Sequence, residues 1–455
     1  MRIAPSPTGL FHIGTARTAL FNYLFAKKNK GSFILRIEDT DKERSEKKFE
    51  NDIMDGLKWL DLNWDEVYYQ SQRTKIYEKY LQKLLDEGRA YKKEIIWFKN
   101  PNKTVVFHDL IRNRVEVDSS VLGDFSLAKD LKTPLYNFAA VIDDHEMGVS
   151  HVIRGEDHIS NTPKQLLIYE AMGWEPPQFA HLPLILGPDR SKLSKRHGAT
   201  SLSDYKNDGY LAEAMVNFMA FLGWNPGDDR EIFSLEELYK EFSLEKIQKG
   251  GAVFNVEKLN WYNSHYLRQL SVDKLTELSI PYLIDDKLIK PNFKFEQYPP
   301  AYGGYFLKQK YLAAKEKKEI PVEKIKKIVG LEQQRMTKLS QVGGLTGFFF
   351  VAPKYKGKLL TWKEMKNTEI AKSLDSTHLI LCDIKDADFT ADKLKLVLMP
   401  AAEKFGSRDR GKMLWPLRVA LTGKEKSPGP FEIAEILGKE ETLKRIKKAK
   451  DLIKK

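Results

Sequence analysis

The first stretch of the chain with residue types suited to chemistry is a loop near its start. Residues 2–15 run RIAPSPTGLFHIGT, with His12 between Gly9 and Gly14. A helix that begins after such a loop presents unpaired N–H groups, which suit a phosphate, and glycine lets a nucleotide approach the backbone. His12 can donate to a phosphate oxygen whose charge grows in a transition state. A surface histidine in a strand–turn–helix fits the same pattern.

A second loop, later in the chain, gathers positive charge. Residues 190–198, RSKLSKRHG, place Lys192 and Lys195 three positions apart after an apolar strand. Two such lysines can clamp a triphosphate, and each contact is on the order of 4 kcal/mol at about 4 Å and an effective dielectric near 20, before desolvation. A mobile loop lets the contact form late, which lowers the barrier. An exposed basic loop is the alternative for this run taken alone.

Alternating strands and helices must position these two loops. Apolar residues at a spacing near 3.6 predict a helix after the first loop, and SFILRIEDTD predicts a buried strand at residues 33–37. Two amphipathic helices follow, the second ending at Gly88. Residues 91–135 are richer in strand patterns, and the first pattern resumes at Leu135, with a helix at 162–172. This order predicts an α/β head with a parallel sheet, interrupted once.

The remainder of the chain has a different hydrophobic pattern from the α/β head. From about Leu202 to the end, helical periodicity dominates, including a continuous pattern over residues 322–339. No internal repeat or low-complexity tract interrupts it. We therefore expect a long helical region after the α/β head.

Composition narrows the class of protein. A length of 455 residues predicts three or four domains, and one cysteine, Cys382, excludes an internal disulfide and a multi-cysteine zinc site. No apolar run approaches the roughly 18 residues that span a bilayer, and the start lacks a secretory pattern, so we expect a cytoplasmic protein without a membrane partner. A net charge of +12 fits a polyanionic partner, with a lysine-rich surface as the alternative.

Taken together, the two loops resemble the two signature sequences of class I aminoacyl-tRNA synthetases. Neighbouring segments narrow the resemblance to the bacterial type of glutamyl-tRNA synthetase. These segments are RIAPSPTG, RIEDTD, YNFA followed by DD, and VIRGEDH in the head, with GGAVFNVEKLNW and WPLRVALTG in the tail. The similarity runs nearly end to end, with at least six motifs in order.

The resemblance implies a multidomain fold. We expect an α/β head, with a Rossmann-type parallel sheet and a short α+β insertion, followed by an all-helical C-terminal half. We expect the catalytic domain in two halves, 1–88 and 136–203, with an acceptor-stem insertion between them at 89–135. A stem-contact domain should follow at 204–271. An anticodon-binding region should occupy 272–455, with subdomains at about 272–345 and 346–455. The insertion is shorter than the family's, with an abrupt join around residues 94–95, so either it is trimmed or residues are omitted.

Members of this family activate glutamate with ATP and magnesium, and then pass the glutamyl group to the terminal ribose of tRNA(Glu). The resemblance therefore implies ATP, Mg²⁺ carried by the ATP phosphates, no zinc, L-glutamate and tRNA(Glu) as partners, and a monomer. One alternative is a form that also charges tRNA(Gln), and another is a non-catalytic tRNA-binding paralogue. A short paralogue that glutamylates a modified tRNA base is disfavoured by the long tail and the single cysteine.

The resemblance also implies roles at the glutamate end of the site. Arg2 matches the residue that pairs with the substrate's side-chain carboxylate, which suits the two parallel hydrogen bonds of a guanidinium. Glu38 matches the acid that accepts the substrate ammonium. Ser6, Tyr136 and Arg154 match other positions of the glutamate pocket.

Other matches concern ATP and tRNA. His12, Lys192 and Lys195 match the catalytic positions, and Thr15 stands where many class I enzymes have a second histidine. The expected ATP contacts are Gly9, His12, Gly14, Thr15, His158, Lys192 and Lys195. In the tail, Arg335 is the candidate for contact with the third anticodon base, with a helix-surface arginine as the alternative.

Four acids at the ends of strands and helices resemble metal ligands. We do not expect them to bind a metal, because paired acids in such places more often cap helices or hold arginines. These acids are Asp39, Asp41, Asp143 and Asp144.

Overall fold

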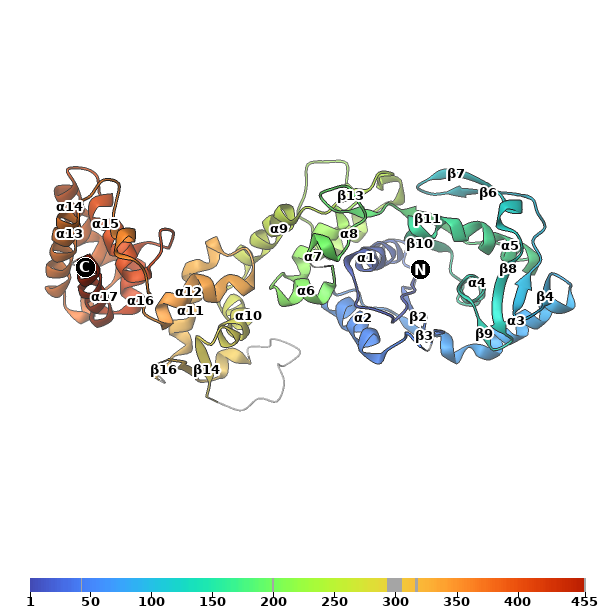
Figure 1. Ribbon diagram of the computed structural model, residues 1–455, viewed down its shortest axis with the longest axis horizontal. Coiled ribbons are helices and arrows are strands. Elements are labelled where there is room, and N and C mark those ends of the chain that lie inside the picture. Colours follow the sequence, from blue (N-terminus) through green and yellow to red (C-terminus); the bar gives the residue numbers. More distant parts are fainter. Residues whose placement is uncertain (42, 199, 293–304, 316–317, 454–455) are drawn as a thin grey trace. The chain divides into compact units, whose positions relative to one another are not determined.

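The computed structural model divides into two compact units, Met1–Asn263 and Ser264–Lys455 (Figure 1). It describes the whole chain except residues 42, 199, 293–304, 316–317 and 454–455, and the side chain of Lys195 also lies outside the described part. Each unit is described by itself below.

The first unit alternates strands and helices. Its strands are β1 (Arg2–Ile3), β2 (Ile34–Ile37), β3 (Glu66–Tyr69), β4 (Ala90–Lys92), β5 (Ile96–Phe98), β6 (Thr104–Asp109), β7 (Asn113–Asp118), β8 (Phe125–Asp130), β9 (Thr133–Pro134), β10 (His151–Gly155), β11 (Gln178–Leu182), β12 (Ile185–Leu186) and β13 (Ala252–Val253). Its helices are α1 (Ile13–Lys28), α2 (Lys47–Trp59), α3 (Thr74–Asp86), α4 (Tyr136–Glu146), α5 (Thr162–Met172), α6 (Leu202–Asn207), α7 (Ala212–Ala220), α8 (Leu235–Glu241) and the start of α9 (Val256–Gln269).

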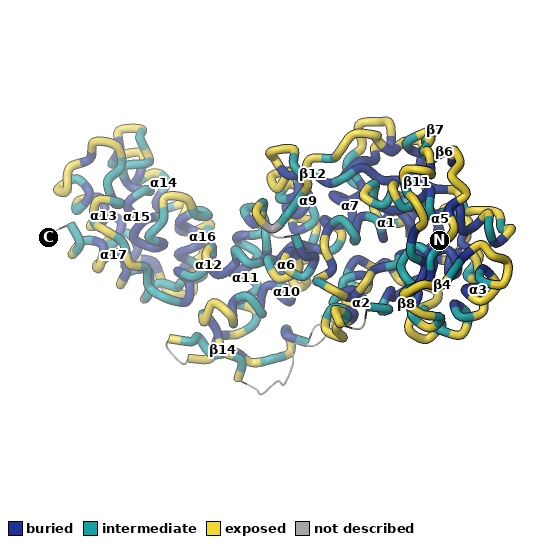
Figure 2. Tube along the Cα trace, turned by 45° about the vertical axis from the view of Figure 1, so that its right-hand side comes forward, coloured by how far each residue is buried: buried dark blue, intermediate teal, exposed yellow. Residues whose placement is uncertain are grey.

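Two sets of parallel strands form the centre of the head. One set has the order β1-β2-β3, and the other pairs β10 with β11. Helix α1 contacts both β1 and β10, and Nδ2 of Asn22 on α1 donates to the carbonyl of Ile153 on β10 at 3.0 Å. Figure 2 shows buried residues concentrated along α1 and exposed residues on the outer loops. The single helix thus holds together the strand ends that carry the site.

The segment expected as an insertion contributes to two sheets. Strands β4, β5, β8 and β9 form a separate antiparallel sheet. Strand β6 instead pairs in parallel with β11 of the central sheet, with Asp109 opposite Phe179, and β7 lies antiparallel to β6. Part of residues 89–135 is therefore continuous with the catalytic sheet.

Asp143 on α4 ties the two halves of the head together. Its carboxylate accepts hydrogen bonds from Gln70 Nε2 at 2.8 Å, Arg73 Nε at 2.6 Å and Tyr77 Oη at 2.7 Å, all from the half that precedes the insertion. Arg36 Nε on β2 lies 3.8 Å away, and both side chains are fully buried. This acid therefore holds arginines, in keeping with its expected structural role.

Among its described residues, the second unit is helical apart from one small antiparallel sheet with the order β14-β15-β16. Its strands are β14 (Ile289–Pro291), β15 (Tyr311–Ala313) and β16 (Glu319–Ile320). Its helices are the end of α9, α10 (Val272–Asp285), α11 (Val322–Glu332), α12 (Val342–Phe350), α13 (Asn367–Cys382), α14 (Ala391–Gly406), α15 (Gly411–Thr422), α16 (Pro430–Leu437) and α17 (Lys439–Ile453).

One helix of this unit is shorter than its sequence pattern predicts. The pattern over 322–339 is broken, because α11 ends at Glu332 and 3₁₀ turns follow at Gln333–Arg335 and Leu339–Gln341. Gln333 Nε2 donates to the carbonyls of Leu267 and Leu270, and these tertiary bonds hold the turn. Periodicity alone does not report such bonds.

In the described parts of both units, no helix combines the length and apolar character that crossing a membrane requires.

We expect Asp143→Asn to lower the free energy of unfolding by about 3 kcal/mol, because it leaves two buried arginines with less negative charge. Urea unfolding measures this change. Asp86→Asn is the matched control, because that carboxylate is exposed at the end of α3 and accepts from Gln82, and it should change stability by less than about 0.5 kcal/mol. Equal effects of the two substitutions would contradict the role of Asp143.

Candidate active site

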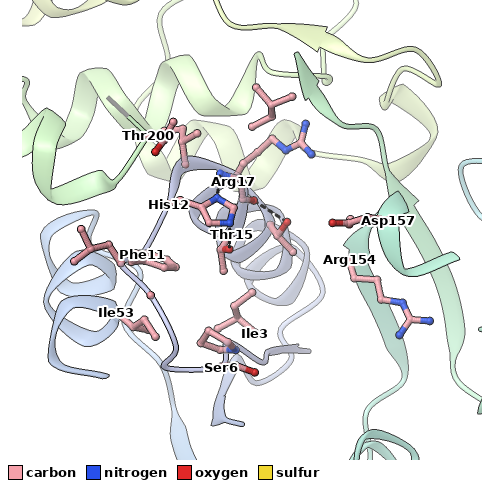
Figure 3. A pocket seen from close by; sticks show the side chains of 18 of the residues that line it. Ile3, Ser6, Phe11, His12, Thr15, Arg17, Ile53, Arg154, Asp157 and Thr200 are labelled. Carbon is pink, nitrogen blue, oxygen red and sulfur yellow. Dashed lines mark hydrogen bonds between the residues drawn. The ribbon is translucent and has the colours of Figure 1, made fainter. Parts of the chain in front are cut away.

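One cleft of about 1390 Å³ lies in the first unit. The first loop, the start of α1, the ends of β1, β2 and β10, and the loop after β11 line it. Figure 3 shows His12 and Thr15 at the start of α1, with Arg154 and Asp157 across from them. The expected site residues that line this cleft are Arg2, Ser6, Gly9, His12, Gly14, Thr15, Glu38, Tyr136, Arg154, His158 and Lys192.

Backbone hydrogen bonds join the two loops that the sequence singles out. Ile13 N donates to Thr200 O at 3.0 Å, and Leu202 N donates to Phe11 O at 2.7 Å. Asp52 on α2 fixes the first loop from the other side, since its carboxylate accepts from Phe11 N at 2.6 Å. The chain that leaves the basic loop is therefore held against the start of α1.

His12 caps helix α1. Its Nδ1 accepts the Gly14 N–H at 3.0 Å, and Thr15 Oγ1 lies 3.3 Å from Nε2. Burial, with Lys192 nearby, lowers the pKa of His12, so the ring is neutral at neutral pH and carries its proton on Nε2. A Cβ on Gly14 would lie 2.9 Å from the ring, so glycine permits this arrangement. The helix start thus offers a neutral donor beside its free N–H groups.

Gly9 differs from Gly14 in what surrounds it. A Cβ at Gly9 would meet no atom within 4 Å, so packing within the described chain does not require glycine there. Gly9 lines the cleft, and its lack of a side chain leaves that space open to a ligand.

The basic loop presents Lys192 to the cleft. Lys192 Nζ pairs with Asp157 Oδ2 at 3.2 Å, and both side chains are about half exposed. The backbone of Lys195 belongs to the 3₁₀ turn Lys195–His197, and its side chain lies outside the described residues. A single surface-accessible ion pair of this kind can be exchanged for a phosphate contact at small cost.

Arg17 is a cleft residue that sequence reasoning missed. Its guanidinium is buried and donates to the carbonyls of Leu222 at 3.0 Å and Pro183 at 2.5 Å. Burial lowers the pKa of Arg17 to about 10. The sequence did carry a signal for Arg17, namely its position in the helical repeat. Arg17 lies four residues after Ile13 and three before Leu20, so it falls on the buried face of α1.

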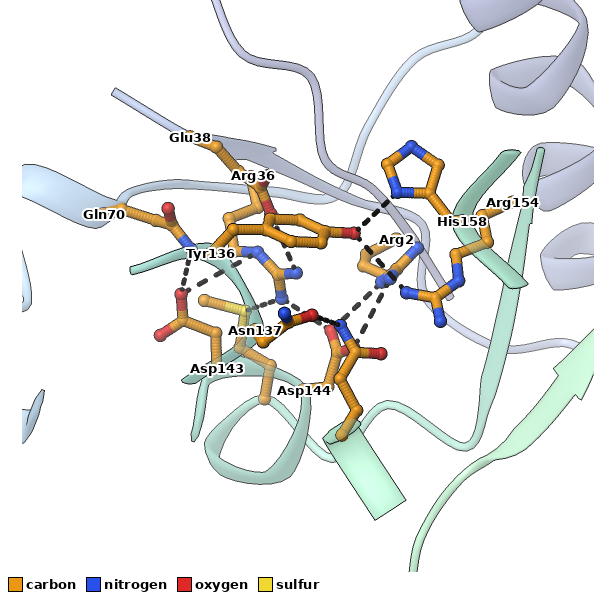
Figure 4. A network of polar contacts seen from close by, with 12 residues as sticks. Arg2, Arg36, Glu38, Gln70, Tyr136, Asn137, Asp143, Asp144, Arg154 and His158 are labelled. Carbon is orange, nitrogen blue, oxygen red and sulfur yellow. Dashed lines mark hydrogen bonds and ion pairs between the residues drawn. The ribbon is translucent and has the colours of Figure 1, made fainter. Parts of the chain in front are cut away.

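Asp144 organises the end of the cleft that contains Arg2. Arg2 donates to it with Nε at 3.0 Å and Nη2 at 3.4 Å, and Arg36 Nη1 donates to the same carboxylate at 2.6 Å. Burial alone would raise the pKa of Asp144, but Arg2 and Arg36 lower it to about 2. Figure 4 shows the two arginines converging on this one side chain. Arg2 is thereby held at the cleft in a fixed orientation.

Glu38 lies on the other side of Arg36. Its Oε1 accepts from Arg36 Nη2 at 3.3 Å. Burial raises the pKa of Glu38 against the opposing attraction of Arg36 and Arg2. A substrate cation would stabilise the ionised form of this carboxylate.

The charges of this buried network balance. It contains three arginines and three carboxylates, joined by the contacts above. They are Arg2, Arg36, Arg73, Glu38, Asp143 and Asp144.

Arg154 adds one positive charge beside the balanced network. It is buried and donates to His181 Nε2 at 3.1 Å, Thr162 Oγ1 at 2.8 Å and Tyr136 Oη at 3.4 Å. No carboxylate pairs with Arg154 among the residues that the structure describes. His158 Nδ1 lies 3.2 Å from Tyr136 Oη, and burial, with Arg154 nearby, lowers the pKa of His158. Among the described residues, Arg154 is therefore a buried cation of the pocket that no carboxylate contacts directly.

Within the described ranges, no group of three or more His, Cys, Asp or Glu side chains could hold a metal ion. Arg335 belongs to the second unit and lies in the 3₁₀ turn after α11. Its Nη1 donates to Glu332 Oε2 at 3.0 Å.

Comparison with known proteins decides the family. A family model described as "tRNA synthetases class I (E and Q), catalytic domain" matches residues 1–96 and 92–261, and an "Anticodon binding domain" model matches 275–450. The chain is 40% identical to Glutamate--tRNA ligase 2 of Thermoanaerobacter pseudethanolicus, over all of this chain and 98% of that protein. The chain belongs to the glutamate–tRNA ligase family. Glutamate--tRNA ligase 1 of Caldanaerobacter subterraneus is also 40% identical, over 99% of this chain and 97% of that protein.

Solved structures agree with this assignment. A glutamate tRNA ligase from Elizabethkingia meningosepticum, in complex with its amino acid, superposes with a TM-score of 0.80 at 33% identity, covering 99% of this chain and 98% of that one. The glutamate-tRNA synthetase from Elizabethkingia anophelis gives 0.81 at 33% identity, with 99% of each chain covered. The predicted family, the enzyme class and the fold class, with its parallel sheet and helical C-terminal half, are confirmed.

One departure from other glutamate–tRNA ligases coincides with the join seen in the sequence. The catalytic family model matches in two pieces that meet at residues 92–96. The alignment with the Thermoanaerobacter ligase spans 504 positions, so that relative carries segments that this 455-residue chain lacks. In the structure the meeting point is the short connection between β4 and β5.

The His12 cap can be tested by two substitutions. We expect His12→Ala to lower the free energy of unfolding by about 1 kcal/mol, because the Gly14 N–H loses its acceptor. His12→Asn should lower the free energy of unfolding by only a few tenths of a kcal/mol, since asparagine is a good N-cap residue. Thermal unfolding of the three proteins measures both changes, and equal stabilities of the alanine and asparagine variants would show that the cap contributes nothing.

Proposed function

We propose that this chain activates L-glutamate with ATP to glutamyl-adenylate and then transfers the glutamyl group to the 3′-terminal ribose of tRNA(Glu). The observation that supports the proposal is one cleft that contains both the start of α1, with its unpaired N–H groups, and the buried guanidinium groups of Arg2 and Arg154. Such a cleft suits an anionic amino acid beside a nucleotide.

In the first step an oxygen of the α-carboxylate of glutamate attacks the α-phosphorus of ATP, and pyrophosphate leaves. His12 is placed to donate a hydrogen bond from Nε2–H to a phosphate oxygen, while its Nδ1 continues to accept the Gly14 N–H at the start of α1. Lys192 exchanges Asp157 for the leaving phosphates, and Lys195 is proposed as the stronger transition-state contact. Gly9, Gly14, Thr15 and His158 are proposed to contact ATP. Positioning and electrostatics suffice, because the displacement needs no protein nucleophile.

At the other end of the cleft, Arg2 is proposed to pair with the side-chain carboxylate of glutamate and Glu38 to accept its ammonium. Ser6, Tyr136 and Arg154 complete the pocket. Glutamine would leave the buried Arg2 without the counter-charge of the substrate, a penalty of about 3 to 5 kcal/mol.

Magnesium is proposed to enter with ATP, held by its phosphate oxygens, where it would neutralise phosphate charge. Glu38 supports this proposal, because its carboxylate is already engaged with Arg36. No step above depends on a protein-held metal.

The proposed roles of the other segments follow the family. Residues 89–135 would contact the acceptor stem, 204–271 the tRNA stem and 272–455 the anticodon, with Arg335 on its third base. We propose that the protein acts as a monomer in the cytoplasm, where translation takes place.

Charging assays with two purified tRNAs test the proposed function. With labelled glutamate, ATP and Mg²⁺, we expect glutamyl-tRNA(Glu) to form, and glutamate-dependent pyrophosphate exchange to require tRNA. Charging of tRNA(Gln) as well would identify the non-discriminating form. Absence of both charging and exchange, with tRNA present, would refute the proposal and support a tRNA-binding paralogue.

We expect Arg2→Ala to raise the KM for glutamate at least about tenfold and to weaken discrimination against glutamine, because about 1.4 kcal/mol or more of carboxylate binding is lost. The fold should persist, since Asp144 keeps Arg36 at 2.6 Å. Arg44→Ala is the control, because Arg44 is exposed and pairs with Asp41, and it should leave both quantities unchanged. Unchanged selectivity in Arg2→Ala would exclude Arg2 as the residue that distinguishes the two substrates.

A further inference from the structure

His181 on β11 is a buried histidine to which the sequence assigns no role. Its Nδ1 lies 2.6 Å from Asp109 Oδ2, and both side chains are fully buried. On the other side of the ring, Nε2 accepts from Arg154 Nε at 3.1 Å, and Thr162 Oγ1 lies 3.1 Å from the same nitrogen. The four side chains form a continuous polar chain from β6 to the wall of the cleft.

The hydrogen bonds fix where the protons lie. Burial alone would raise the pKa of Asp109, but the hydrogen bond with His181 lowers it, so Asp109 is a carboxylate. Burial lowers the pKa of His181, so its ring is neutral. A neutral imidazole has one donor and one acceptor, and arginine cannot accept. His181 must therefore donate from Nδ1 to Asp109, because only then is Nε2 free to accept from Arg154.

Backbone bonds hold Asp109 in turn. Its Oδ1 accepts from Ile111 N at 2.9 Å and Arg112 N at 2.7 Å, in the turn between β6 and β7. The carboxylate is thus part of a rigid turn, and its other oxygen is aimed at His181. A carboxylate held in this way can set the tautomer of the ring.

We propose that Asp109 and His181 are positioning residues for glutamate, which set the orientation of Arg154 by fixing the acceptor for its Nε. Arg154 then uses one N–H of each terminal nitrogen on Thr162 and Tyr136, and keeps one N–H on each for a substrate carboxylate. The inference rests on the proposed function, since it assumes that the cleft binds glutamate. Figure 4 shows Arg154 beside Tyr136 and His158 at the pocket wall.

The alternative is a satisfied core histidine that matters only for stability. Two features favour positioning. Arg154 lines the cleft, whereas Asp109 and His181 do not, so the series of hydrogen-bonded side chains runs from the core to the cleft. Arg154 also has no carboxylate partner in the described chain, so its hydrogen bonds orient the guanidinium without neutralising it. A purely structural arginine would gain more from a carboxylate in the place of the histidine.

Asp109→Asn tests the tautomer directly. Asn Oδ1 can keep the bonds from Ile111 N and Arg112 N, while its amide nitrogen faces His181 Nδ1. The ring must then accept at Nδ1 and carry its proton on Nε2, against the Nε–H of Arg154. In charging of tRNA(Glu), we expect the KM for glutamate to rise at least tenfold and the KM for ATP to change less than twofold. A loss of stability alone would not separate the two KM values.

Two substitutions of His181 form a matched pair. The amide oxygen of glutamine reaches the place of Nε2, whereas that of asparagine reaches only the place of Nδ1. His181→Gln should keep the KM for glutamate within threefold, and His181→Asn should raise it at least tenfold. In the His181→Gln background, Asp109→Asn should change this KM less than twofold, because no ring remains to be reoriented. If Asp109→Asn alone does not fold, the matched pair decides.

His145→Gln is the control, because His145 is an exposed histidine on α4 that stacks on Trp174, and both KM values should stay unchanged. An unchanged glutamate KM in Asp109→Asn, equal effects of His181→Gln and His181→Asn, or equal rises in the two substrates' KM values would each overturn the positioning role. A wild-type protein that charges no tRNA with glutamate would instead overturn the proposed function.

Discussion

The end of the cleft at Arg2 depends on one carboxylate that two arginines share. Asp144 accepts from Arg2 and Arg36, and it supplies the negative charge that allows the guanidinium of Arg2 to be buried there. The shared carboxylate keeps Arg2 close to the cleft before any substrate is present, so little side-chain entropy is lost on binding. It also leaves the network of three arginines and three carboxylates neutral as a whole.

The other end of the cleft works by a different physical rule. There the backbone of α1 offers N–H groups, and His12 serves both as helix cap and as a neutral donor. Lys192 forms an ion pair with Asp157 at a partly exposed position, where such a pair is weak enough to be exchanged for another contact. The charges around Arg2 are thus fixed by buried contacts, whereas the charge of Lys192 is exchangeable. This difference suits the proposed reaction, in which glutamate would be held still while charge moves onto a departing diphosphate.

Sequence patterns predicted the parallel sheet, the helix at 162–172 and the loops around His12 and Lys192, because these depend on local spacing and on glycine and proline. They did not predict Arg17 as a cleft residue or the link between Asp109 and His181. Those depend on strands far apart in the chain, since β6 and β11 meet only in the folded sheet. The broken helix near Arg335 has the same cause, because tertiary bonds from Gln333 override a continuous helical period.

The segment expected as an insertion divides between two sheets that relate differently to the cleft. The two pieces of the family match meet at residues 92–96, in the connection between β4 and β5, which belong to a separate antiparallel sheet. Strand β6 ends at Asp109, whose carboxylate reaches His181 and through it Arg154. The path from Asp109 to Arg154 runs through β6, whereas the connection between β4 and β5 lies in a separate sheet. Within the segment expected as an insertion, β6 is therefore the part that is coupled to the cleft.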